Sequence, residues 1–267
     1  MQLTDKVLVV TGGGNGIGRE VTLALLSRGA RVAAVDLRPD GLEETARLAA
    51  AGDRLSTHIA DITDRSAVAA LPGLVVAHHG QVDGLVNVAG VIQEFVPFNE
   101  LGFAEMEKVL AVNLWGVLHT TKAFLPHLLE RPAACVVNVS SMGALAPVPG
   151  QTIYGASKAG VKLFTEGLYA ELRDTSVAVT VVFPGGVGTD IATNSGATIP
   201  GIDPDDSELA AHLTTPAEAG RQVVEGIEKG SYRVLIGRDA RMLDKLSRLM
   251  PRRATELVAK KMAELLK

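Results

Sequence analysis

The chain has 267 residues, of which 47% are apolar and 28 are glycine, and its formal net charge is −4. This length suits one large α/β domain with a sizeable core, and the acidic balance argues against general nucleic-acid binding. The single cysteine, Cys135, excludes an intrachain disulfide and lies in the apolar run ACVVNV, so we expect a buried thiol in a reducing compartment.

Residues 1–6 are polar, and a glycine-rich motif follows them almost at once. We therefore expect no signal peptide and a cytoplasmic location. No apolar run in the sequence reaches the length of a membrane span. The six histidines show no metal-ligand spacing with cysteine or carboxylates, so no metal site is expected.

Short apolar runs alternate with segments of helical length along the chain. Strands are expected at 6–11, 31–36, 55–60, 82–90, 135–141, 177–185 and 232–237. Helices are expected at 16–28, 40–51, 64–78, 104–130, 152–173 and 216–229. Several strands are apolar throughout, which is typical of a parallel sheet with helices on both faces. This pattern predicts one doubly wound α/β domain over residues 1–267.

The first expected strand leads into T-G-G-G-N-G-I-G, residues 11–18. Gly12, Gly16 and Gly18 allow a sharp turn, and together with Asn15 and Ile17 they bring a helix N-terminus close to a ligand. Free N–H groups and the helix dipole favour a pyrophosphate there. A glycine cluster alone is weak evidence, but its position between a strand and a helix is the context that a dinucleotide site requires.

The second expected strand ends at Asp36, eighteen residues after Gly18. A carboxylate at this point can accept hydrogen bonds from an adenosine ribose diol and would repel a 2′-phosphate. Arg38 is the one nearby residue that could receive such a phosphate. The pattern favours NAD(H), with NADP(H) as the alternative.

Two further chain segments are expected to reach the cofactor. Asp61 and Ile62 follow the third strand, where a carboxylate and an apolar side chain could hold an adenine; equally, Asp61 could cap the next helix. The N-V-A-G motif, with Asn87, Ala89 and Gly90, ends the fourth strand. Ligands bind at this carboxyl edge of open α/β sheets.

Tyr154 and Lys158 stand four residues apart in a segment expected to be helical. One helical turn separates them, so both side chains project from the same face. A phenol ordinarily titrates near pH 10, and a neighbouring ammonium group would lower its pKa toward the range useful for proton transfer. The same spacing also occurs by chance on amphipathic helices, so the pair depends on the motifs around it.

Taken together, these motifs resemble the classical short-chain dehydrogenase/reductase family over nearly the whole chain. The resemblance is carried by T-G-G-G-N-G-I-G, Asp61, N-V-A-G, Asn113, Ser140-Ser141, Y-G-A-S-K and P-G-G-V-G-T. It implies a Rossmann-like sheet of about seven strands, a nicotinamide cofactor and interconversion of alcohols and ketones. Val88 is a mild departure, because the family more often has asparagine there.

The resemblance also implies roles for individual residues. Tyr154 would be the acid/base, and Lys158 would bind the nicotinamide ribose while lowering the pKa of the phenol. Ser141 would hold the substrate oxygen, with Ser140 as the less well spaced competitor. Asn113 would hold a water linking Lys158 to solvent; otherwise it is simply a polar residue on a buried helix.

The segment after the sixth strand would serve the nicotinamide. The turn there begins with Pro184 and Gly185. The resemblance implies that Thr189 hydrogen-bonds the carboxamide and that Val187 backs the ring.

Three segments should frame the substrate: 91–99, 142–152 and 186–213. None contains lysine or arginine, so a substrate carboxylate or phosphate would lack an obvious partner. We expect a neutral, hydrophobic secondary alcohol or ketone. The third segment is predicted to be a lid over the substrate rather than an ordinary surface loop.

Residues 238–267 form a basic C-terminal extension with nine Lys or Arg and four Asp or Glu, and its apolar residues recur at helical spacing. Such a helix more often packs on its own domain or a sister subunit than on a membrane surface. The resemblance implies a homo-oligomer, a dimer or tetramer, formed through the helices at 104–130 and 152–173.

The leading hypothesis is therefore an NAD(H)-dependent oxidoreductase for a hydrophobic, uncharged secondary alcohol and its ketone. An NADPH-dependent 3-oxoacyl reductase is the nearest alternative. Two further possibilities are a non-catalytic, dinucleotide-sensing scaffold and a lipid-surface enzyme delivered by its tail.

Overall fold

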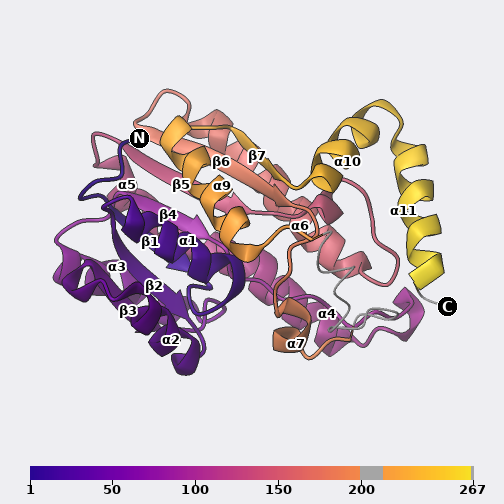
Figure 1. Cartoon of the computed structure of the whole chain (residues 1–267), viewed down its shortest axis with the longest axis horizontal. Coiled ribbons are helices and arrows are strands. Elements are labelled where there is room, and N and C mark those ends of the chain that lie inside the picture. Colours follow the sequence, from indigo (N-terminus) through magenta and orange to yellow (C-terminus); the bar gives the residue numbers. More distant parts are fainter. Residues whose placement is uncertain (199–212, 266–267) are drawn as a thin grey trace.

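The computed structural model describes residues 1–198 and 213–265. Seven parallel strands form one sheet in the order β3-β2-β1-β4-β5-β6-β7 (Figure 1). The strands are β1 Val7–Thr11, β2 Arg31–Asp36, β3 Leu55–Ile59, β4 Gly84–Asn87, β5 Ala134–Val139, β6 Val177–Pro184 and β7 Arg233–Ile236. The sheet is Rossmann-like, as predicted, and its order reverses between β1 and β4.

Helices cover both faces of this sheet (Figure 1). They are α1 Gly16–Ser27, α2 Pro39–Ala49, α3 Arg65–His79, α4 Phe103–Leu110, α5 Gly116–Leu129, α6 Thr152–Leu172, α7 Ile191–Ser195, α9 Pro216–Lys229, α10 Arg238–Leu249 and α11 Pro251–Leu265. Alternate residues of one strand face opposite sides. Leu8 and Val10 belong to the core under α1 and α9, whereas Val7 and Val9 belong to the core under α3, α5 and α6.

Two expected elements differ in detail from the structure. The strand expected at 82–90 ends at Asn87, because residues 88–90 turn away from the sheet. The helix expected at 104–130 contains one π-helical turn, Ala111–Trp115, in which the N–H of Gly116 bonds the carbonyl of Ala111. Such single turns insert one extra residue into a helix and are frequent at functional sites. The turn contains Asn113.

The C-terminal extension consists of α10 and α11, and Pro251 begins the second helix. Proline suits the first helical position, where its missing N–H would have no partner within the helix. Leu243 and Ala254 are buried against Ala146, with Leu246 and Val258 packed around them. Part of the apolar stripe therefore packs on the protein itself. None of the described helices is long and apolar enough to cross a bilayer.

A buried carboxylate organises the amino edge of the sheet. Asp83 precedes β4 and is fully buried. One of its oxygens accepts hydrogen bonds from Lys6 (3.3 Å) and Arg131 (2.9 Å), and the other accepts from the backbone N–H of Val7 and the amide of Gln81. Both oxygens of Asp83 therefore accept hydrogen bonds from segments that meet at this edge of the sheet.

Candidate active site

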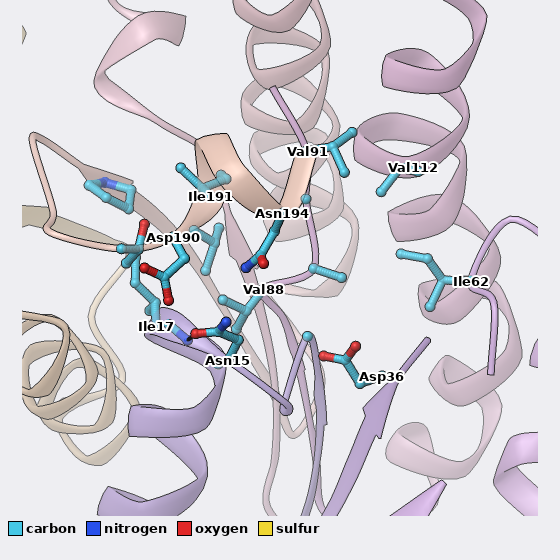
Figure 2. A pocket seen from close by; sticks show the side chains of 18 of the residues that line it. Asn15, Ile17, Asp36, Ile62, Val88, Val91, Val112, Asp190, Ile191 and Asn194 are labelled. Carbon is cyan, nitrogen blue, oxygen red and sulfur yellow. Dashed lines mark hydrogen bonds between the residues drawn. The ribbon is translucent and has the colours of Figure 1, made fainter. Parts of the chain in front are cut away.

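A cavity of about 340 Å³ lies at the carboxyl ends of the strands (Figure 2). Its lining includes the following predicted site residues: Gly12, Asn15, Gly16, Ile17, Gly18, Asp36, Asp61, Ile62, Ala89, Gly90, Ser141, Tyr154, Lys158, Pro184, Gly185, Val187 and Thr189. The ends of six strands, β1 to β6, and the turns that follow them contribute to it. The two predicted residues that do not line the cavity are Asn87 and Asn113.

The glycine-rich turn leaves no room for side chains at its closest approaches. A Cβ on Gly18 would lie 2.0 Å from the carbonyl oxygen of Gly12, and one on Gly12 would lie 2.9 Å from the Cα of Ala89. Gly12 also has a φ of +70°, which favours glycine. Thr45 Oγ1 donates to the carbonyl of Gly13 and fixes the turn from α2.

The turn delivers the N-terminus of α1 to the cavity. Asn15 caps this helix by accepting from the N–H of Gly16, and Arg19 secures the loop by donating to the carbonyl of Gly14. Because the first N–H groups of a helix lack partners within it, they and the helix dipole suit an anion such as a pyrophosphate.

Asp36 ends β2 at the far side of the glycine-rich turn. Its carboxylate accepts from the N–H of Gly14 (2.9 Å) and of Arg38 (3.0 Å), and it faces the cavity (Figure 2). Each oxygen keeps a free lone pair that a ribose hydroxyl could donate to. The guanidinium of Arg38 does not turn toward Asp36 but donates to Asn194 Oδ1 (2.7 Å).

The helix after β3 is capped by Asp64, which accepts from the N–H groups of Ser66 and Ala67. The alternative role considered for Asp61, the cap of this helix, is therefore wrong. Asp61 instead holds the turn through Thr63 at 2.7 and 2.8 Å, and it lines the cavity.

Ile62 forms an apolar wall of the cavity and fills the space above Gly116. A Cβ on that glycine would lie 2.5 Å from Ile62 Cδ1. The isoleucine can therefore present its side chain to a flat ring such as adenine, as the sequence predicted for this position.

The side chain of Asn87, which is expected to serve the cofactor, has its hydrogen-bond partners within the protein. Asn87 is buried in the interior, where its amide donates to Asn138 Oδ1 (2.8 Å) and accepts from Thr120 Oγ1 (2.8 Å). Asn138 in turn donates to Thr165. This chain of bonds ties β4 and β5 to α5 and α6, because a buried polar group needs partners.

Tyr154 and Lys158 project from the first two turns of α6 into the cavity, together with Ser141 from the turn after β5. Ser141 Oγ accepts from the N–H of Gly143 (3.0 Å). Ser140 is committed elsewhere, since its hydroxyl donates to the carbonyl of Lys158 (2.7 Å). The choice of Ser141 over Ser140 agrees with this arrangement.

Burial governs the charges of this pair. It raises the pKa of the Tyr154 phenol, while the Ser141 hydroxyl acts in the lowering direction. Burial also lowers the pKa of Lys158 to about 8. The ammonium donates to the carbonyl of Val139 (3.1 Å) and lies 6.0 Å from the centre of the tyrosine ring. The predicted lowering of the phenol's pKa by Lys158 is not found: burial raises this pKa, and the lowering influence comes from the Ser141 hydroxyl.

Asn113, from the π-helical turn, stands behind the pair and is fully buried. Its amide accepts from the N–H of Val91 (2.8 Å) and donates to the carbonyl of Val91 (2.8 Å) and to Ser157 Oγ (3.1 Å). A Cβ on Gly90 would lie 3.2 Å from Asn113 Oδ1 and 3.1 Å from Lys158 Nζ. Glycine at this position thus lets the asparagine and the lysine approach the same point.

The turn after β6 closes the cavity. Val187 pairs with Thr214 in an isolated parallel bridge, and the N–H of Thr214 bonds the carbonyl of Gly186. We call residues 186–188 with 213–214 the lid base, because the segment predicted as a lid leaves and returns here. Asp239 supports it by accepting from the N–H of Gly186 (2.7 Å). The predicted lid residues 199–212 lie outside the described part.

Some residues of the cavity were missed by the sequence reasoning. Asp190, Ile191 and Asn194 reach it from α7 and the residue before this helix, and Val91 and Val112 also line it (Figure 2). Val112 could have been found from its place beside Asn113. The α7 residues carried no signal beyond their position shortly after Thr189. Among residues 1–198 and 213–265, no cluster of His, Cys, Asp or Glu could hold a metal ion.

Comparison with known proteins gives a consistent set of similarities. The family model described as short chain dehydrogenase matches residues 6–200. A putative oxidoreductase SadH of Mycobacterium tuberculosis is 39% identical over 264 residues, covering 95% of this chain and 94% of that protein. Levodione reductase of Leifsonia aquatica is 32% identical over 213 residues, or 79% of each chain.

Among solved structures, this chain is similar to a short chain dehydrogenase/reductase from Burkholderia phymatum in complex with NAD. That structure shares 26% identity, has a TM-score of 0.82 and covers 93% of this chain and 94% of its own.

Proposed function

The chain belongs to the short-chain dehydrogenase family of oxidoreductases, and we propose that it uses NAD(H) to interconvert a hydrophobic, uncharged secondary alcohol and its ketone. The observation that carries this proposal is the meeting of Ser141, Tyr154 and Lys158 at one end of a cavity whose other end presents Asp36.

The residues present fit a nicotinamide dinucleotide. Gly12, Gly18 and Gly90 each stand where an added Cβ would meet backbone or catalytic side chains, so the chain can lie against a flat, extended ligand. The N-terminus of α1 suits the pyrophosphate, and Asp36 suits a ribose diol. When bound, the nicotinamide would accept or donate a hydride.

The protein's own part in the reaction is proton transfer. Ser141 would hold the substrate oxygen by a hydrogen bond, and Tyr154 would give that oxygen a proton during ketone reduction or remove one during alcohol oxidation. Lys158 would hold positive charge beside the phenol and bind the nicotinamide ribose. Asn113 would hold the water that links Lys158 to solvent, as the family resemblance implies.

NAD(H) is favoured over NADP(H) by the surroundings of Asp36. Its carboxylate would repel a 2′-phosphate, and the nearest guanidinium, Arg38, is bonded to Asn194 rather than free to meet one. The similarity to a structure in complex with NAD supports the same choice. Under the NADPH-dependent 3-oxoacyl reductase alternative, Arg38 would leave Asn194 for the phosphate.

An uncharged substrate is supported by the walls around the reacting groups. Val91 lines the cavity and follows Gly90, the glycine that Lys158 Nζ approaches, and Lys158 itself is committed to the reaction. No lysine or arginine occurs in the three segments expected to frame the substrate. A bound carboxylate would therefore lie without a pairing cation.

The proposal is tested first by replacing Tyr154 with phenylalanine. Turnover of a secondary alcohol should fall on the order of 10²- to 10⁴-fold, whereas NADH binding followed by fluorescence should stay unchanged. Surviving turnover would overturn the role of Tyr154. A wild-type protein that binds NADH but turns over no member of a panel of steroids, sugars, acyl derivatives and simple alcohols would favour the non-catalytic scaffold.

The cofactor is tested by measuring kcat/KM with NADH and with NADPH on one generic ketone. We expect a preference for NADH. A strong preference for NADPH, lost in Arg38→Ala, would instead support the 3-oxoacyl reductase.

We also propose a homo-oligomer formed through α4, α5 and α6. Large apolar side chains are well exposed along them, namely Phe103 on α4, Trp115 in the π-helical turn between α4 and α5, and Leu163 on α6. Light scattering on Leu163→Glu should then report smaller particles than wild type, with Leu74→Glu on α3 as the control. For the C-terminal extension, packing on the chain itself is favoured over membrane contact, because Leu243 and Ala254 are already buried.

A further inference from the structure

We propose that Gln93 is a positioning residue for catalysis, which holds the first turn of α6 and with it Tyr154 in the productive place. This inference rests on the proposed role of Tyr154 as the acid/base. It concerns a residue that touches neither the cavity nor the expected substrate atoms but bonds directly to the backbone of the tyrosine.

Tyr154 is the third residue of α6 and therefore lies in the first turn, the part of a helix that frays most easily. The first four N–H groups of a helix have no partner within it, and unsupported first turns fray. Gln151, the residue before the helix, makes no capping bond with its side chain. Its amide oxygen has no hydrogen-bond partner within the described part of the chain, although it is buried. The usual local cap is therefore missing.

Gln93 supplies the cap from a distant segment. Its side-chain oxygen accepts from the N–H of Ile153 (2.8 Å) and from the N–H of Tyr154 itself (3.0 Å). These are two of the N–H groups that a normal cap would satisfy. Because an amide oxygen has two lone pairs, one side chain can serve both donors.

The position of Gln93 is itself fixed on every side. The residue is fully buried, and its amide nitrogen donates to the carbonyl of Gly150 (2.9 Å). In return, Gln151 donates from its side chain to the backbone carbonyl of Gln93 (2.7 Å). The two glutamines thus bind each other's segments, and the loop after β4 is tied to the start of the catalytic helix.

Lys158 has anchors that do not involve Gln93. It is held one turn later by the bond from Ser140 to its carbonyl and by its own bond to Val139. Loss of the Gln93 contact should therefore displace Tyr154 relative to a lysine that stays in place, and small misplacements of a reacting group can lower rates strongly.

The test compares Gln93→Met, which keeps the length of the side chain but removes its acceptor, with Asp64→Ala. Asp64 caps α3 through two N–H groups, does not itself line the cavity and bonds none of the reacting residues, so its loss is a structural control of similar kind for kcat. Both variants should lose a few degrees in Tm, on the scale of a lost helix cap. Only Gln93→Met should lose kcat, by about tenfold or more, with the Kd for NADH within about twofold of wild type.

Two further variants of Gln93 complete the test. Gln93→Glu retains an acceptor for both N–H groups, so its kcat should lie closer to wild type than that of Gln93→Met. If Gln93→Met does not fold, Gln93→Asn, whose oxygen is withdrawn by one methylene, is expected to show the same loss of kcat. A wild-type kcat in the folded methionine or asparagine variant would overturn the inference, whereas activity in Tyr154→Phe would overturn the proposed function instead.

Discussion

Among single residues, Lys158 is expected to be needed for catalysis and at the same time to destabilise the fold. The residue is buried, with 3% of its surface exposed, and burial lowers the pKa of its ammonium to about 8. No carboxylate accepts from it; its one hydrogen bond within the described structure goes to the carbonyl of Val139. A buried charge with a single neutral partner destabilises a fold, and such strain is typical of groups retained for catalysis.

Lys158→Met should therefore abolish turnover but stabilise the protein at pH 7, by about 1 kcal/mol. The sign of the pH dependence follows from linkage. Between pH 8 and 10.5 the unfolded lysine still holds a proton that the folded one has released, so wild-type stability rises with pH across this window. The advantage of the methionine variant should shrink there. Urea unfolding at pH 7 and at pH 9 measures it, and a constant advantage would contradict the buried-charge explanation.

The raised pKa of Tyr154 gives a second prediction. At neutral pH the phenol keeps its proton, which is the form that ketone reduction needs, whereas alcohol oxidation needs the phenolate. Oxidation should therefore accelerate as the pH rises above neutrality, and reduction should slow as the phenol ionises. Profiles of kcat in both directions check this, and an oxidation rate that is flat with pH would count against Tyr154 as the base.

The sequence predicted the identities of these residues better than their partners. Tyr154, Lys158 and the glycines of the first turn were found because their spacing is local and each motif follows a strand. The internal partners of Asn87, Asn138 and Thr120, were not predicted because they come from segments that are distant in the chain. Gln93 was missed for the same reason, since its bond to Tyr154 joins residues 61 positions apart.

At the scale of elements, the lid base depends on the start of α10. Asp239 accepts from the N–H of Gly186 and of Ala240. Cβ atoms on Gly185 and Gly237 would lie 2.0 and 2.4 Å from its carboxylate. The carboxylate therefore occupies the space between the turn after β6 and the turn after β7, and it fixes the residues expected to contact the nicotinamide.

Asp239→Ala should loosen that turn and raise the KM for NAD by about tenfold, which corresponds to one lost charge-assisted hydrogen bond. Asp239→Asn, which keeps one acceptor oxygen, should fall between the alanine variant and wild type. Asp244→Ala on the same helix is the matched control, because Asp244 pairs with Arg233 and Arg248 and does not line the cavity. It should lower Tm and leave KM unchanged; equal KM effects would refute the role of Asp239.

Element type and order were predictable because buried parallel strands are apolar throughout and the segments between them have helical length. The π-helical turn was not, because inserting one residue at 111–115 leaves the apolar pattern of a long helix nearly unchanged. The division of the C-terminal extension at Pro251 was visible as a proline. Its packing on the segment that follows Ser141 depends on tertiary contacts, and no local pattern encodes those.

In the whole molecule, the carboxyl edge and the amino edge of the sheet have different roles. The carboxyl edge holds the cavity, and the amino edge holds Asp83 with its four donors. Removing one member of a buried ion pair leaves the others without compensation, which destabilises strongly. The separation of the edges predicts that stability and activity can be changed independently.

Asp83→Ala should lower the free energy of unfolding by about 3 kcal/mol, since it leaves the N–H of Val7 buried without its side-chain acceptor. Turnover by the folded fraction should stay at the wild-type level. Urea unfolding and kcat per folded molecule, measured on the same sample, separate the two quantities. A loss of kcat in fully folded protein would contradict the independence of the edges.

The pairing of Val187 with Thr214 has a practical meaning for engineering. The chain departs and returns at neighbouring points, and closing a loop of twice the length adds only about 0.6 kcal/mol of entropy cost. Residues between Gly188 and Leu213 can therefore be exchanged for the corresponding stretch of a relative, longer or shorter, provided that Thr189 is retained for the nicotinamide, while Asp239 keeps the junction in register. Grafts at these two points offer a way to transplant substrate range onto an unchanged hydride-transfer centre.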